Sequence, residues 1–191
     1  MKHYIIIGVA AVLLTGCATA SQSGAMVPAV SEQSIVTPQS KLFESVSLGD
    51  VGGGKETNPL WTSQVSSESF AEALEQTFAA HAMLSSDEGD YRLDAELVKL
   101  KQPFAGTSMS VTSDVKYTLT NIDTGAVVFD EVISEKYTAA FSDSFVAVKR
   151  LQLANEGSIK SNLSTLMEKL ISSVDGVSEP IAWFQTPKTA G

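Results

Sequence analysis

Thiols and imidazoles are scarce in this chain. Its 191 residues include a single cysteine, Cys17, and two histidines, His3 and His81. One cysteine cannot form an internal disulfide, and metal sites usually need clustered cysteine, histidine and carboxylate side chains. A Ser-His-Asp triad in the folded region would have to use His81, and no Gly-x-Ser-x-Gly motif is present. These absences favour a non-enzymatic protein for which we expect neither a metal nor a cofactor.

Positive charge is also in short supply. The chain has 13 lysines and arginines against 22 acidic residues, and its formal net charge is −9. An acidic chain repels phosphate backbones, so we do not expect nucleic acid as a partner. No basic run is present that would bind an anionic membrane surface. The length suits one domain with one hydrophobic core.

An unbroken apolar run occupies the N-terminus, from Tyr4 to Leu14. A membrane-spanning helix needs roughly 20 residues, so this run is too short to cross a bilayer. Lys2 precedes the run, and small residues and Cys17 follow it. This pattern is typical of a secretory signal peptide.

The sequence Leu14-Thr15-Gly16-Cys17 resembles the lipobox of bacterial lipoproteins, which reads Leu, a small residue, Gly or Ala, and then Cys. The resemblance implies that the signal peptide, residues 1–16, is removed and that Cys17 then carries lipid on its sulfur and its amine. In such lipoproteins an Asp directly after the cysteine favours retention in the inner membrane. This chain has Ala18 there, so the resemblance implies the periplasmic face of the outer membrane in a Gram-negative host. The alternative is an ordinary signal peptide with an incidental cysteine.

Residues 17–40 are interpreted as the lipidated cysteine and a flexible tether. This stretch is rich in Ser, Ala, Gln and Thr, includes Pro28 and Pro38, and shows no sustained hydrophobic period. We expect a single α/β domain over residues 41–176 and a polar C-terminal tail over 177–191.

Hydrophobic periodicity predicts six elements within that domain. A strand is predicted around Leu42–Leu48 and ends at three glycines. A helix follows and runs to His81. One of three serines could cap this helix, and Ser69 with Glu72 fits a capping box. The last helix is expected to start at Asp143 or Ser144 and to end at Gly176. The apolar stripe of this last helix covers 148–174. Strands are predicted over 91–97, 109–119 and 127–137.

The order strand, helix, three strands, helix predicts an α+β fold, a two-layer α/β sandwich with a mixed sheet and two helices on one face. The first two strands flank a helix and should be parallel, whereas short loops make the later strands antiparallel. Glu131 and Glu135 share a face with apolar residues, which is typical of an edge strand. This element order resembles small envelope lipoproteins, namely the lipopolysaccharide-assembly lipoprotein and the auxiliary lipoproteins of lipid-transporting ABC systems.

Two polar motifs are interpreted without a binding role. Residues 49–56 nearly spell a phosphate-binding P-loop, but Glu56 replaces the Ser or Thr that should bind magnesium, so we interpret them as a flexible loop. Asp87, Glu88 and Asp90 miss the spacing of a calcium loop and are interpreted as a solvated turn.

Several side chains keep two interpretations. His81 lies on an apolar helix face, where a buried histidine competes with a catalytic base. Asn155 and Asn162 interrupt or border the stripe of the last helix, and either bond to neighbouring backbone or mark where that stripe leaves the core. Trp183 and Phe184 either fold back on the core or form a docking motif, because aromatic residues dominate binding hot spots.

These features favour a non-enzymatic outer-membrane lipoprotein that acts as a tethered interaction and assembly module of the cell envelope, held by lipid on Cys17 and bound to an envelope protein. One alternative is an accessory subunit of a lipid or lipopolysaccharide transport system. Another is a periplasmic protein that binds a small apolar ligand between sheet and helices. A filled interior favours the interaction module, and a large apolar cavity favours ligand binding.

Overall fold

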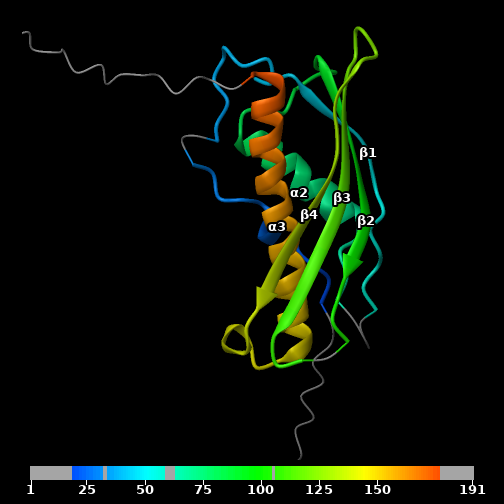
Figure 1. The fold of residues 1–191 in the computed structure, drawn as a ribbon, viewed down its shortest axis with the longest axis vertical. Coiled ribbons are helices and arrows are strands. Elements are labelled where there is room, and N and C mark those ends of the chain that lie inside the picture. The colour runs from blue at the N-terminus through cyan, green and yellow to red at the C-terminus, as the bar shows by residue number, and fades with distance from the viewer. Residues whose placement is uncertain (1–18, 32–33, 59–62, 105, 177–191) are drawn as a thin grey trace, which may run out of the picture.

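A four-stranded sheet forms one layer of the molecule, and two helices pack across it as the second layer (Figure 1). The computed structural model describes residues 19–31, 34–58, 63–104 and 106–176. In chain order its elements are α1 (Ser23–Met26), β1 (Val46–Gly52), α2 (Ser67–Ala80), β2 (Tyr91–Lys101), β3 (Met109–Asn121), β4 (Val127–Ala139), the 3-10 turn η1 (Phe141–Asp143) and α3 (Ala147–Val174).

The strands follow one another across the sheet in the order β1-β2-β3-β4. β1 is parallel to β2 because α2 carries the chain back to the same end, whereas the other two pairs are antiparallel. β4 lies at a sheet edge, as predicted from its mixed face. The predicted α+β sandwich with a mixed sheet is confirmed.

Strict alternation in β2 explains why one sheet face is covered and the other is open. Tyr91, Leu93, Ala95 and Leu97 are buried, whereas Arg92 and the other intervening side chains lie on the opposite, exposed or half-exposed face. Period-2 alternation is the pattern of a half-buried strand. The polar face of the sheet therefore remains open.

The space between the layers is filled by large side chains. Tyr117 and Leu93 from the sheet are fully buried against both helices. Leu163 and Leu166, predicted to lie mid-stripe in the last helix, are fully buried as expected. The helices contribute mainly Phe70, Leu74 and Phe78 from α2 and Ile159, Leu163 and Leu166 from α3.

The helix ends differ in part from the predicted ones. Ser66, rather than Ser69, is the N-cap of α2, and its hydroxyl accepts a hydrogen bond from the Ser69 backbone N at 3.1 Å. α3 starts after Val146, so neither Asp143 nor Ser144 is its N-cap. The Asp143 carboxylate instead caps η1, where it accepts a 2.8 Å bond from the Ala140 backbone N.

The predicted end of the last helix is confirmed. Gly176, at a φ of +76°, follows the final turn of α3. Glycine adopts this left-handed conformation at low cost, which is why it commonly ends helices.

The segment before β1 is docked on the domain instead of forming a free tether. It contains α1, and the side chains of Met26 and Val36 are buried. The Ser21 backbone N donates to the Gln64 carbonyl at 3.1 Å. The predicted flexible tether is therefore wrong for the part of residues 17–40 that the structure describes, and the folded unit begins before Lys41. Met26, Pro28 and Val36 supply the burial from a mostly polar stretch without a sustained hydrophobic period, so no periodic signal revealed it.

Candidate functional site

Buried polar side chains of α3 point into the domain and bond to the sheet. The Asn162 amide donates to the carbonyls of Ile133, at 2.8 Å, and Ser113, at 3.2 Å. Its Oδ1 accepts a 2.8 Å bond from the Tyr117 hydroxyl. Burial raises the pKa of Tyr117 well above its ordinary value. Asn162 thus interrupts the apolar stripe to connect α3 with β3 and β4, which settles the alternatives that the sequence left open for it.

A second polar group near the start of α3 holds the N-terminal segment. The Gln152 amide donates to the Ala20 carbonyl at 3.1 Å and to Glu156 Oε1 at 2.8 Å. The same Glu156 oxygen accepts a 3.0 Å bond from the Gln22 backbone N. Both side chains are buried, so these bonds are sheltered from water. They fix the chain a few residues after Cys17.

Asn155 extends this anchoring to the first described residue. Its amide donates to the Ser63 carbonyl at 3.0 Å, and the Ser63 hydroxyl donates to the Thr19 carbonyl at 2.7 Å. Gln102, at the end of β2, donates to the same Ser63 carbonyl at 2.9 Å. Asn155, like Asn162, therefore bonds to neighbouring groups within the fold. Thr19 is held only two residues from Cys17, which itself lies outside the described residues.

Exposed aromatic side chains gather at the end of the molecule where α3 begins, which is the lower end in Figure 1. Phe104 follows β2 and is fully exposed, and Phe145, just before α3, is 80% exposed. Phe141 is 49% exposed and meets Phe145 edge to face, with 5.3 Å between the ring centroids. These rings project from two neighbouring loops rather than from the core.

One buried arginine ties these two loops together. The guanidinium of Arg150 lies 5.1 Å from the Phe141 ring centroid and donates to the Ser144 carbonyl at 2.6 Å. It also donates to the Gly106 carbonyl, in the other loop, at 3.4 Å. The Arg150 side chain is buried, so the loops are held from inside while their aromatic rings face outward.

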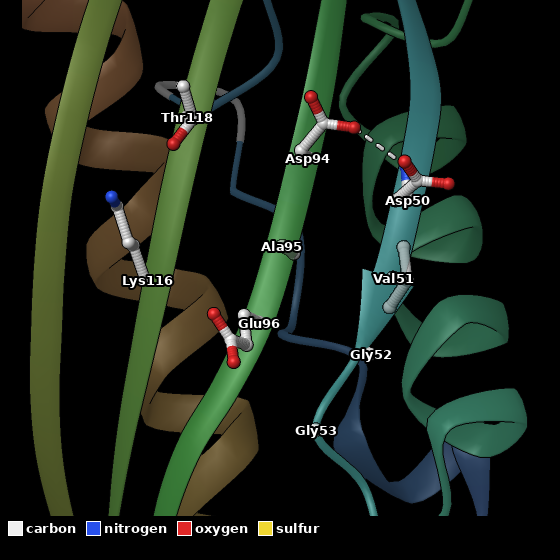
Figure 2. Close-up of a pocket in the computed structure, with 9 residues that line it drawn as sticks. All are labelled: Asp50, Val51, Gly52, Gly53, Asp94, Ala95, Glu96, Lys116 and Thr118. Atoms are coloured by element: carbon white, nitrogen blue, oxygen red, sulfur yellow. Dashed lines mark hydrogen bonds between the residues drawn. The ribbon is translucent and has the colours of Figure 1, made fainter.

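The open sheet face carries a shallow hollow of about 470 Å³ between β1, β2 and β3 (Figure 2). Asp50, Asp94 and Glu96 contribute carboxylates to it, and Lys116 lies across from them. A bulge in β1 turns the Asp50 backbone N toward Asp94 Oδ1, at 2.7 Å. None of the lining residues is a histidine or cysteine, and the described residues contain no cluster arranged to hold a metal ion.

An exposed arginine offsets part of this negative charge. Arg92 forms 3.0 Å ion pairs with Asp50 and Asp94. Its hydrogen bond to Asp94, together with the charges of both carboxylates, raises the pKa of Arg92. Exposed pairs of this kind contribute little to stability. With three carboxylates and one lysine in its lining, the hollow can receive a positively charged group on a partner.

His81, part of the P-loop-like stretch and the acidic turn all belong to the fold itself. His81 is buried, and its Nδ1 donates to the Thr77 carbonyl at 2.7 Å. Residues 49–52 of the P-loop-like stretch are part of β1, so the loop interpretation is wrong there. Asp87, Glu88 and Asp90 lie exposed in the turn before β2, as predicted. Trp183 and Phe184 lie outside the described residues, so both of their interpretations stay open.

No helix among the described residues has the length and apolar character needed to cross a bilayer. In sequence, the chain matches no protein-family model and no curated protein.

In structure, it is similar to protein XCC0632 from Xanthomonas campestris, which bears the family designation DUF330. The TM-score is 0.55 at 11% identity, over 82% of this chain and 96% of that one. A candidate lipoprotein from Caulobacter crescentus aligns with a TM-score of 0.48 at 15% identity, over 72% and 95% of the two chains. PelC from Paraburkholderia phytofirmans, a dodecamer, aligns with a TM-score of 0.44 at 17% identity, over 69% of this chain and 94% of that one. The first of these similarities establishes a shared fold.

Proposed function

We propose that this chain is a non-enzymatic lipoprotein, anchored to the outer membrane through lipid on Cys17, that serves as an interaction and assembly module of the cell envelope. The lipobox Leu14-Thr15-Gly16-Cys17 carries the proposal. The docked segment behind it supports the proposal as well, because Thr19, two residues after Cys17, is held to the domain by the Ser63 hydroxyl. The anchor and the domain are therefore close neighbours.

The interior supports an interaction module rather than a binder of small apolar ligands. Tyr117, Phe70 and Phe78 are fully buried between sheet and helices and occupy the space that such a ligand would need. The hollow on the open face is polar and lined by carboxylates. Binding to another macromolecule, through outer surfaces, is the function that these features suit best.

The anchoring is tested by Cys17→Ser in cells labelled with a radioactive palmitate precursor. We expect label and membrane recovery for the wild type, and neither for Cys17→Ser. Thr15→Ser is the matched control, because it keeps a small residue at its lipobox position and should retain the label. Equal membrane recovery of all three proteins, with no label in any, would refute the anchoring.

The cellular role is tested by complementation of a deletion strain, scored for envelope integrity. A chain with an ordinary cleavable signal peptide and Cys17→Ser should be exported and folded but should fail to restore integrity. Because tethering raises effective concentration without any new contact, its loss should weaken binding to a membrane-bound partner. Full rescue by the soluble protein would contradict an anchored module and favour a diffusible one.

A further inference from the structure

We propose that the aromatic end of the domain, formed by residues 101–104, 106–108 and 140–146, rests in the headgroup region of the membrane that holds the lipid anchor. This inference builds on the proposed lipidation of Cys17. It assigns a lipid surface as the partner of an exposed patch and gives the domain an end-on orientation relative to the bilayer.

The short distance from the anchor to the docked chain is the first argument. Two residues of extended chain span at most about 7 Å, and Cys17 is two residues before Thr19. Because Thr19 is held by the Ser63 hydroxyl, the domain cannot stand far from the bilayer. Part of its surface must touch the headgroups.

The position of the docking contacts determines which part that is. The Ala20 carbonyl accepts a hydrogen bond from Gln152. Gln152 is six residues after Val146, the N-cap of α3, so it lies about 9 Å from the start of the helix along its axis. The aromatic loops lie beyond that start of α3 (Figure 1). An anchor next to Thr19 therefore places the aromatic end, rather than the distant β3–β4 turn, at the membrane.

The chemistry of this end suits a lipid interface. Phe104 and Phe145 are the most exposed of its rings, and Val146 beside them is 53% exposed. Aromatic side chains favour the boundary between headgroups and acyl chains.

The charge of this end also differs from that of the chain as a whole. Its residues include one lysine, Lys101, and one acid, Asp143, so they are neutral in sum, whereas the whole chain carries −9. The Asp143 carboxylate is turned onto the Ala140 backbone N. This end thus carries no net negative charge that would oppose contact with anionic lipids.

The lone cysteine makes a direct test possible. Once the sulfur of Cys17 carries lipid, an introduced cysteine is the only free thiol in the chain. Phe104→Cys and Phe145→Cys place a thiol in each aromatic loop, and Ile122→Cys is the control at the opposite end, in the exposed β3–β4 turn. Each lipidated protein is labelled with an environment-sensitive fluorophore and reconstituted into phosphatidylethanolamine–phosphatidylglycerol vesicles that contain a lipid-borne quencher.

We expect blue-shifted emission and loss of fluorescence at positions 104 and 145, and neither change at position 122. Equal, weak quenching at all three positions would overturn the inference, and so would equal, strong quenching, which indicates a domain lying flat. Circular dichroism checks that each variant is folded. Mass spectrometry of the purified protein separates the two proposals: an unlipidated Cys17 refutes the anchoring, whereas a lipidated protein without quenching in the aromatic loops refutes only the orientation.

Discussion

The hydroxyl of Tyr117 on β3 donates a 2.8 Å hydrogen bond to Oδ1 of Asn162 on α3, and both side chains are fully buried. The Asn162 amide also donates to the Ile133 carbonyl on β4. In an apolar interior each group left without a partner costs about 1–3 kcal/mol. The pair therefore restricts α3 to one rotation and one register on the sheet, which apolar packing alone leaves less well determined.

Replacing Tyr117 by Phe should lower the free energy of unfolding by about 1–3 kcal/mol, because it leaves Oδ1 of Asn162 buried without a donor. Chemical denaturation of the purified domain measures this loss. Tyr137→Phe is the matched control, since Tyr137 is 41% exposed, and it should change the free energy of unfolding by less than about 0.5 kcal/mol. Equal effects of the two substitutions would show that the buried bond stabilises nothing.

The same tyrosine should make stability depend on pH in alkaline solution. The unfolded chain releases the Tyr117 proton near pH 10, an approximate ordinary pKa, whereas burial raises the pKa in the folded protein well above that value. Above about pH 10 the folded state binds more protons, so stability falls as pH rises; below it Tyr117 contributes no dependence. Denaturant midpoints between about pH 8 and about pH 11 should fall less steeply for Tyr117→Phe than for wild type or Tyr137→Phe. Parallel curves would contradict this.

Leu163→Ala should cost about 2–5 kcal/mol of stability, because it opens a cavity beneath the sheet. Leu163 is fully buried in the main core. Val132→Ala, at a position that is 57% exposed on β4, is the control and should change stability by less than about 0.5 kcal/mol. Thermal or urea unfolding distinguishes the two. An unchanged midpoint for Leu163→Ala would mean that α3 does not cover the sheet.

Met26→Ala tests whether the N-terminal segment belongs to the folded unit. Met26 is fully buried, so we expect a loss of about 2–5 kcal/mol, whereas a free tether would give none. Val30→Ala, in the same segment but 41% exposed, is the control. In agreement with this, a chain that starts at Lys41 should unfold at lower denaturant than one that starts at Ala18. Identical denaturation midpoints for these two chains would show that the segment before Lys41 is a flexible tether and not part of the folded unit.

Sequence patterns anticipated the sheet well because its strands are covered on one face only. The alternation from Tyr91 to Leu97 fixes which face is buried whatever the rest of the chain does. The docking of Thr19–Met26 was missed because it depends on tertiary contacts and not on a local pattern. It depends on Gln152 and Glu156, whose side chains meet the segment only after α3 is oriented on the sheet. Phe104 and Phe145 lie in loops without periodicity, so nothing in the pattern distinguished them from core residues.

Closing the N-terminal segment onto α3 joins residues far apart in the chain: Ala20 with Gln152 and Gln22 with Glu156, separated by 132 and 134 positions. Such distant closure costs chain entropy, so we expect it to form late in folding. Until α3 has been synthesised and seated on the sheet, the peptide around Cys17 has no docking partners there. In a lipoprotein, that interval leaves the cleavage and acylation site accessible to the enzymes that modify it. Under the proposed lipidation of Cys17, completion of the fold would immobilise the modified end, so modification would have to precede the last step of folding.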